Sequence, residues 1–129
     1  MTLTITPLYA AALGLMMIGL TIMVIVHRAR SGVSILHGED MHLAESIRRH
    51  GNFIENVPMA LILLGFAELM GAPPLLLHSA GAILILSRVL HPFGIYHDHD
   101  GPVIFRILGG VGTWLAMLAA IGYIGWVAL

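Results

Sequence analysis

The stretch from Pro7 to Val26 contains no charged residue, and it ends in the cationic sequence His27-Arg28-Ala29-Arg30. An uncharged apolar helix of about 20 residues matches the ~30 Å hydrocarbon core of a bilayer. A cleavable signal peptide carries its cations before the apolar run, and residues 1–6 carry none. We therefore interpret this stretch as a retained transmembrane helix.

The remainder of the chain has the same apolar character. Of the 129 residues, 58% are hydrophobic and 10% are charged, against about 45–50% and about 25% in soluble domains. A chain this short cannot hide so much apolar surface inside itself, so the excess must face lipid. We expect three further spans at about 42–70, 75–94 and 102–129, separated by polar or Gly/Pro-rich turns. The sequence thus predicts one all-α integral membrane domain over residues 1–129, built as a bundle of four transmembrane helices.

Charge and cysteine content exclude several classes of protein. The formal net charge of −1 provides no footprint for nucleic acid. The absence of cysteine removes disulfides, thiol nucleophiles and thiolate metal ligands. All six cations are arginines, so the placement of arginine carries most of the remaining argument.

The arginines predict an orientation in the membrane. Arg28 and Arg30 lie in the first connection, and Arg106 closely follows the third. The two termini and the second turn contain no arginine. The positive-inside rule therefore places the first and third connections in the cytoplasm and both termini outside.

Polar residues recur inside three of the expected spans. On the second, Arg48, Asn52 and Glu55 share one helical face because they are spaced i, i+4 and i+7. Arg88 and His91 share a face of the third span, and Arg106 lies on the fourth. Because such side chains are costly in a membrane, we expect a shared pocket at the cytoplasmic side. A purely structural role remains open for Glu55 and Arg88, and we expect Arg49 and His50 to face solvent or headgroups.

The chemistry of this expected pocket suits a particular type of ligand. Guanidinium groups bind carboxylates in a bidentate manner. An amide and one carboxylate add contacts for a peptide group and an amine. The ligand expected from these groups is anionic at both ends and also carries an ammonium group.

The motifs on the second, third and fourth spans resemble those of a known family. The segment Glu45–Pro58 is similar to the second-helix signature Arg-x-His-x-Asn-x-x-Glu of the MAPEG family, the membrane-associated proteins in eicosanoid and glutathione metabolism. Ser87–His91 resembles the family's third-helix Arg-x-x-His, and Arg106 stands where the family has a fourth-helix arginine. The resemblance covers nearly the whole chain and is nearest to bacterial members, which implies a location in the bacterial inner membrane.

The resemblance implies a homotrimer that binds glutathione between subunits near the cytoplasmic face. The residues that it implies as glutathione contacts lie in the first connection and on the second and third spans: Arg28, Arg48, Asn52, Glu55, Arg88 and His91. Arg30 remains an alternative to Arg28. The resemblance also implies that Arg106 stabilises the glutathione thiolate. Family activities include glutathione transferase, peroxidase and eicosanoid synthase, whereas one branch binds lipid without catalysis.

The chain differs from some eukaryotic members at three places. Gly51 stands where those members have a second arginine, and Ile95 and Gly110 stand where they have tyrosines. The prediction is a glutathione-dependent transferase or peroxidase that acts on lipophilic electrophiles. The alternative is a non-catalytic membrane protein of the same fold that binds a lipid or metabolite, or serves as a scaffold. A transporter fits poorly, because the first apolar run has no charge.

The third connection contains alternating histidine and aspartate residues, His97 to Asp100. A metal site needs three or four converging ligands, and His-x-His with mobile carboxylates does not supply them. We expect a solvated polar turn here and no metal site.

Overall fold

The computed structural model describes residues 2–98 and 101–129, which form helices and connecting loops without any strand. The α-helices are α1 (Thr6–Ser31), α2 (Met41–Leu69), α3 (Pro74–Leu90) and α4 (Val103–Ala128), and the short 3-10 helix η1 (His91–Gly94) extends α3. Four segments are long and apolar enough to cross a membrane, with η1 counted together with α3. The predicted all-α architecture with four membrane-spanning helices is therefore confirmed.

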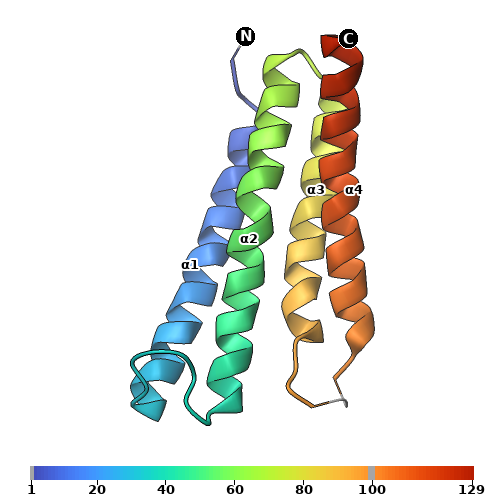
Figure 1. Cartoon of the computed structure of the whole chain (residues 1–129). Coiled ribbons are helices and arrows are strands. Elements are labelled where there is room, and N and C mark those ends of the chain that lie inside the picture. The colour runs from blue at the N-terminus through green and yellow to red at the C-terminus, as the bar shows by residue number, and fades with distance from the viewer. Residues whose placement is uncertain (1, 99–100) are drawn as a thin grey trace.

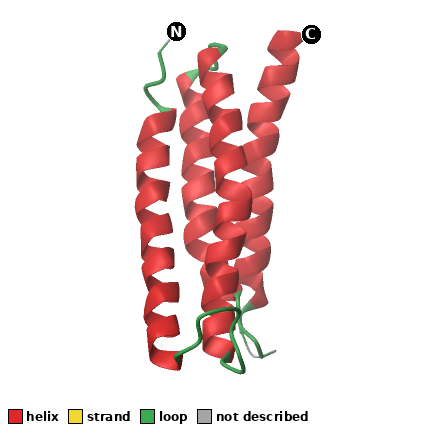
Figure 2. Ribbon diagram, turned by 60° about the vertical axis from the view of Figure 1, so that its left-hand side comes forward, coloured by secondary structure: helices red, strands yellow, loops and turns green. Residues whose placement is uncertain are grey.

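The helices lie side by side in an up-and-down bundle (Figure 1). In Figure 1, α1 lies beside α2 and α3 lies beside α4, and both termini are at the same end. Turned by 60°, the bundle shows its loops gathered at the two ends (Figure 2). The first and third connections therefore share one end, and the second connection lies with the termini at the other.

Local sequence explains where the helices begin and end. Gly32 ends α1 in the left-handed conformation, with φ of 68°, which glycine adopts without strain. The side chain of Asp40 accepts a hydrogen bond from the backbone N–H of Leu43 at 3.0 Å and so caps α2. Pro74 occupies the first turn of α3, where its missing N–H costs nothing.

One helix bound differs from that expected from sequence, and the third span changes its type of helix within the expected bounds. α1 continues beyond Val26 through the arginines to Ser31, because nothing before Gly32 interrupts the helical hydrogen bonds. The expected third span is α-helical only to Leu90, and then tightens into η1 around Pro92. Proline at that position lacks the N–H that an α-helix needs.

Leucine and alanine side chains form the core between the helices. Leu13, Leu77 and Leu84 are each about 1% exposed. Even so, only 11% of the most apolar part of α1 and 22% of that of α4 are buried by the rest of the chain. The remaining apolar surface must face lipid or another copy of the protein.

A buried carboxylate at the terminal end of the bundle holds the start of α1. Glu68, near the end of α2, accepts hydrogen bonds from the backbone N–H groups of Thr4, Ile5 and Thr6 at 2.6–2.7 Å. These groups are donors that a helix N-terminus leaves without partners. Ile5 at the N-cap position makes no side-chain cap of its own, so a residue of α2 performs the capping.

We predict that Glu68→Ala lowers the free energy of unfolding by about 1–3 kcal/mol, because buried backbone donors lose a charged acceptor. The measurement is the thermal midpoint of the detergent-solubilised protein. Glu39→Ala is the control, since Glu39 is an exposed loop residue. Equal midpoints for the two variants would contradict the capping role.

Candidate functional site

The polar face of α2 has the geometry that its spacing predicts. Arg48 Nη1 donates a hydrogen bond to Glu55 Oε1 at 3.0 Å, and the two side chains are 59% and 53% exposed. Asn52 lies between them on the same face. This ion pair therefore lies along the surface of α2 and is not covered by the other helices.

Arg88 joins three helices inside the bundle. It extends from α3, is 2% exposed, and donates from Nη1 to Asn52 Oδ1 on α2 at 2.9 Å. Its Nη2 donates to the backbone carbonyl of Gly109 on α4 at 2.6 Å. The Nε atom is buried and has no partner among residues 2–98 and 101–129.

Two cavities lie on the side of Asn52 that faces α4. One has a volume of about 430 Å³, and the other a volume of about 330 Å³. Both are lined by Asn52, His91 and Arg106. The larger cavity adds the apolar wall of α4, and the smaller one adds Arg48 and Ile95. The structure thus brings together predicted residues from α2, η1 and α4 around one polar space.

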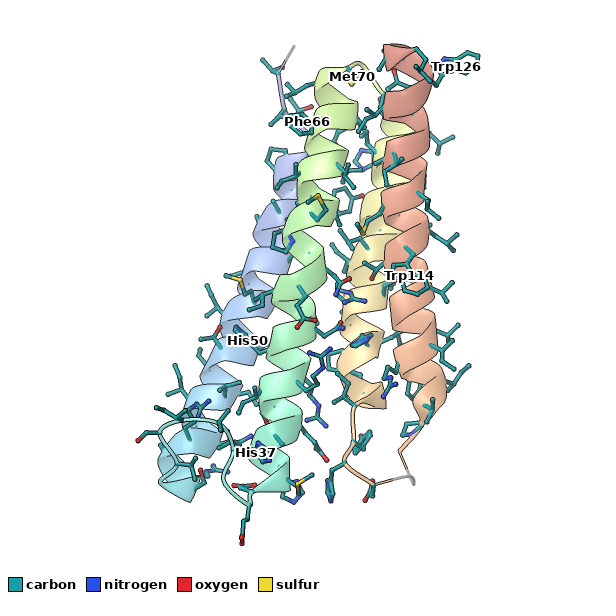
Figure 3. The ribbon with its side chains drawn as sticks, viewed as in Figure 1. His37, His50, Phe66, Met70, Trp114 and Trp126 are labelled. Atoms are coloured by element: carbon teal, nitrogen blue, oxygen red, sulfur yellow. The ribbon has the colours of Figure 1, made fainter. Side chains whose placement is uncertain are left out.

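The polar space borders an apolar region of the same bundle. The larger cavity continues along Ile107, Gly110, Val111 and Trp114 of α4. In Figure 3, Trp114 lies near the middle of α4. Nitrogen-bearing side chains gather between α2 and the α3–α4 pair, between Trp114 and the end of the bundle opposite the termini. A ligand in this space meets hydrogen-bond donors at one end and hydrocarbon at the other.

Two glycines allow the backbone approach that places His91 and Arg106. A Cβ atom at Gly94 would lie 2.2 Å from the backbone nitrogen of Arg106, and one at Gly109 would lie 2.6 Å from Cβ of His91. Both distances are far below van der Waals contact. Glycine at these positions therefore lets α4 pack directly against η1 and the end of α3.

A second polar cluster lies on the other side of α2. Arg49 Nη2 donates to Glu45 Oε2 at 3.1 Å and to the carbonyl of Ile95 at 2.7 Å. Its guanidinium carbon lies 5.4 Å from the centroid of the Tyr96 ring. The interpretation of Arg49 as a solvated or headgroup-facing residue was wrong, because its side chain is only 17% exposed and is held by the third connection.

Glu45 in this cluster also binds His97. Its Oε1 accepts from the backbone N–H of His97 at 3.0 Å and lies within hydrogen-bond distance of the His97 ring. The hydrogen bond with Glu45 raises the pKa of His97 above its usual range, and the charge of Asp98 acts in the same direction. Glu45 and Arg49 together fasten the third connection to the start of α2.

The remaining predicted positions lie apart from the cavities. Arg28 Nη1 donates to the carbonyls of Val33, Ser34 and Leu36, so within one chain it closes the first connection. Arg30 is exposed. His50 was expected to face solvent or headgroups, and its Nε2 instead lies 3.1 Å from Thr21 Oγ1 of α1.

The histidine- and aspartate-rich turn is described only in part, since His99 and Asp100 lie outside the described residues. Within residues 2–98 and 101–129, no group of three or more histidine, aspartate and glutamate side chains converges as a metal site would require. His97 and Asp98 instead line a small space of about 170 Å³ beside Arg106.

Sequence reasoning missed the roles of Glu45 and Glu68. For Glu45, a signal was present, because a glutamate four residues before an arginine on a helix favours a pair. For Glu68, the only signal was a carboxylate in an otherwise apolar half-helix. Its partners, at the start of the chain, are more than 60 residues away.

The fold and the cavity together describe an integral membrane four-helix protein with an arginine-rich site at one end. The model of the MAPEG family matches residues 6–126, and the chain belongs to that family. It is 30% identical over 126 residues to inner membrane protein YecN of Escherichia coli (strain K12), covering 95% of this chain and 94% of that protein. The YecN protein of a second Escherichia coli strain, CFT073, matches to the same extent. No solved structure matches the chain.

Proposed function

We propose that this protein binds glutathione in the space lined by Asn52, His91 and Arg106 and joins it through its sulfur to lipophilic electrophiles. The observation that carries the proposal is the convergence of these side chains from separate helices on two adjoining cavities. Glutathione has two carboxylates, two peptide carbonyls and a thiol. Arginine donates hydrogen bonds to carboxylate and carbonyl oxygens, and its charge attracts the thiolate. Membership of a family that includes glutathione transferases supports the same ligand.

In the proposed reaction, the protein supplies electrostatic stabilisation and position. Arg106 lies where donor groups meet the apolar wall of α4, and its positive charge favours the thiolate over the thiol. The thiolate attacks the electrophilic carbon of the second substrate and displaces a leaving group such as halide. The thiol proton passes to water. The apolar residues toward Trp114 receive the lipophilic partner.

Arg28 and the oligomeric state belong to the same proposal. Within one chain, Arg28 is engaged with carbonyls of the first connection and does not line the two cavities. In the proposed homotrimer it contributes to the site from a neighbouring copy. The large apolar surfaces of α1 and α4 that the chain leaves uncovered are available for such an assembly.

One observation favours a second candidate, a non-catalytic protein that binds glutathione or an anionic lipid. Ile95 and Gly110 stand where some eukaryotic relatives have tyrosines, and both line the cavities. Neither supplies a hydroxyl donor at the thiol. Consumption of an aryl halide in the presence of glutathione by the purified protein distinguishes the transferase from this binder.

We predict that native protein in detergent binds glutathione and that Arg106→Ala weakens binding by about 1.5–3 kcal/mol, the contribution of a hydrogen bond to a charged group. Isothermal titration calorimetry measures both affinities. Glu39→Ala is the control, because Glu39 is exposed in the first connection and lines neither cavity. If native protein shows no binding at millimolar glutathione, the proposed function is wrong.

Glu55→Gln separates a ligand contact from a structural counter-ion. The partner of Glu55 in the described part of the chain is Arg48, and the pair is exposed, so we expect the stability to change by less than about 1 kcal/mol. We expect the glutathione affinity to fall, because the ammonium of the ligand loses its carboxylate. Thermal unfolding and calorimetry in the same detergent test both effects. Lost stability with unchanged affinity would assign Glu55 to the scaffold.

The proposed topology has both termini outside and the glutathione site toward the cytoplasm. It rests on the arginines, since Arg28, Arg48 and Arg106 all lie toward the end of the bundle opposite the termini. A phosphatase reporter that is active only outside the cytoplasm should be active when fused after Leu129. If instead a reporter that works only in the cytoplasm is active at this position, the proposed topology is wrong and the opposite orientation holds.

A further inference from the structure

The orientation of the Asn52 amide follows from its contact with Arg88. Arg88 Nη1 lies 2.9 Å from Asn52 Oδ1. A guanidinium group has only donors, so the atom of the amide that faces it must be the acceptor oxygen. The opposite assignment would place an NH2 group against an N–H group inside the bundle, where unpaired donors are costly.

Both acceptors of Asn52 are therefore in use. The side-chain oxygen accepts from Arg88, and the backbone carbonyl accepts from Asn56 Nδ2 at 2.8 Å. The polar group of Asn52 that has no partner among residues 2–98 and 101–129 is its NH2 group, so this is the group that Asn52 presents to a molecule in the cavities. The other polar residues that line these cavities are Arg48, Asn56, Arg88, His91 and Arg106, without any carboxylate among them.

Arg88 offers little surface to a ligand. Its side chain is 2% exposed, and both terminal nitrogens are already bonded, one to Asn52 and one to the Gly109 carbonyl. The contact with the Gly109 carbonyl fixes the guanidinium relative to α4. Gly109 itself is packed directly against His91. Arg88 is thus held from two sides while it holds Asn52.

We infer that Arg88 is a positioning residue that makes Asn52 a dedicated hydrogen-bond donor, so the part of glutathione against Asn52 is a carboxylate or peptide carbonyl oxygen. An ammonium group at this point is disfavoured, because it would face the NH2 group of Asn52 and the guanidinium of Arg106. This inference rests on the proposed function. It changes the expected role of Arg88 from a glutathione contact to a residue that acts through Asn52.

Asn52→Asp tests the inference without changing the size of the side chain. The aspartate still accepts from Arg88 through one oxygen, and the NH2 donor is replaced by a second, negatively charged oxygen. We expect the dissociation constant for glutathione to rise about tenfold or more, which corresponds to the loss of one charge-assisted hydrogen bond. The thermal midpoint should not fall, because the contact with Arg88 becomes an ion pair.

A double-mutant cycle tests whether Arg88 acts through Asn52. Arg88→Lys should weaken glutathione binding in the native background and have no further effect when Asn52 is replaced by alanine. Glu39→Ala, a change at an exposed residue that lines neither cavity, is the control, and it should leave the affinity unchanged. If Arg88→Lys does not fold, the Asn52→Asp variant still decides whether Asn52 acts as a donor to glutathione.

The outcomes separate this inference from the proposed function. Unchanged affinity of Asn52→Asp, or additive losses in the cycle, would overturn the inference and leave glutathione binding in place. Failure of native protein to bind glutathione would overturn both. In the native protein, the side-chain NH2 resonances of Asn52 should also shift when glutathione is added, and resonances that do not move would contradict the donor role.

Discussion

A guanidinium group within a membrane-spanning helix is costly, about 2.5–3.5 kcal/mol near the bilayer centre, unless the protein supplies partners for it. Arg88 has such partners from both neighbouring helices, the amide oxygen of Asn52 and the carbonyl of Gly109. These bonds hold α2, α3 and α4 together toward the end of the bundle opposite the termini. The larger cavity beside Asn52, His91 and Arg106 is bordered by Arg88, so the residues that hold this charge also form part of its wall.

α1 is attached to the bundle by a different set of polar contacts. Glu68 caps its start, and His50 contacts Thr21 farther along. Near its end, the His27 ring lies within hydrogen-bond distance of Ser46. All of these partners belong to α2. Within one chain, the cavities with Arg106 are therefore built by α2, α3, η1 and α4, and α1 supports them from outside through α2 and through the contact of Tyr9 with His78 of α3.

Sequence patterns predicted the elements well because the physical signals are local. Uncharged runs, Gly32, Asp40 and the Pro73-Pro74 pair define the helices and their ends within a few residues. The common face of Arg48 and Glu55 follows from helical periodicity alone, and the structure pairs them. Local signals therefore give the fold and one side of the candidate site.

Contacts between distant segments were not readable in the same way. Arg49 looked like a residue for headgroups because nothing nearby in sequence shows that the carbonyl of Ile95, 46 positions away, lies beside it. The direction of the Asn52 amide likewise depends on Arg88, 36 positions away. Periodicity identifies the residues that face inward, but the donor or acceptor that each one presents depends on its packing partner.

The polar and apolar parts of the larger cavity explain why a site of this kind belongs inside a membrane protein. A water-soluble peptide thiol and a lipophilic electrophile have opposite preferences for solvent, so their encounter requires a boundary. Here the donors of Asn52 and Arg106 lie next to the hydrocarbon surface from Ile107 to Trp114. In the function we propose, the anionic ligand enters from the end of the bundle opposite the termini, and the electrophile enters from the lipid along α4. Because Ile95 and Gly110 add no hydroxyl at this boundary, the proposed function assigns the stabilisation of the thiolate to the positive charge of Arg106.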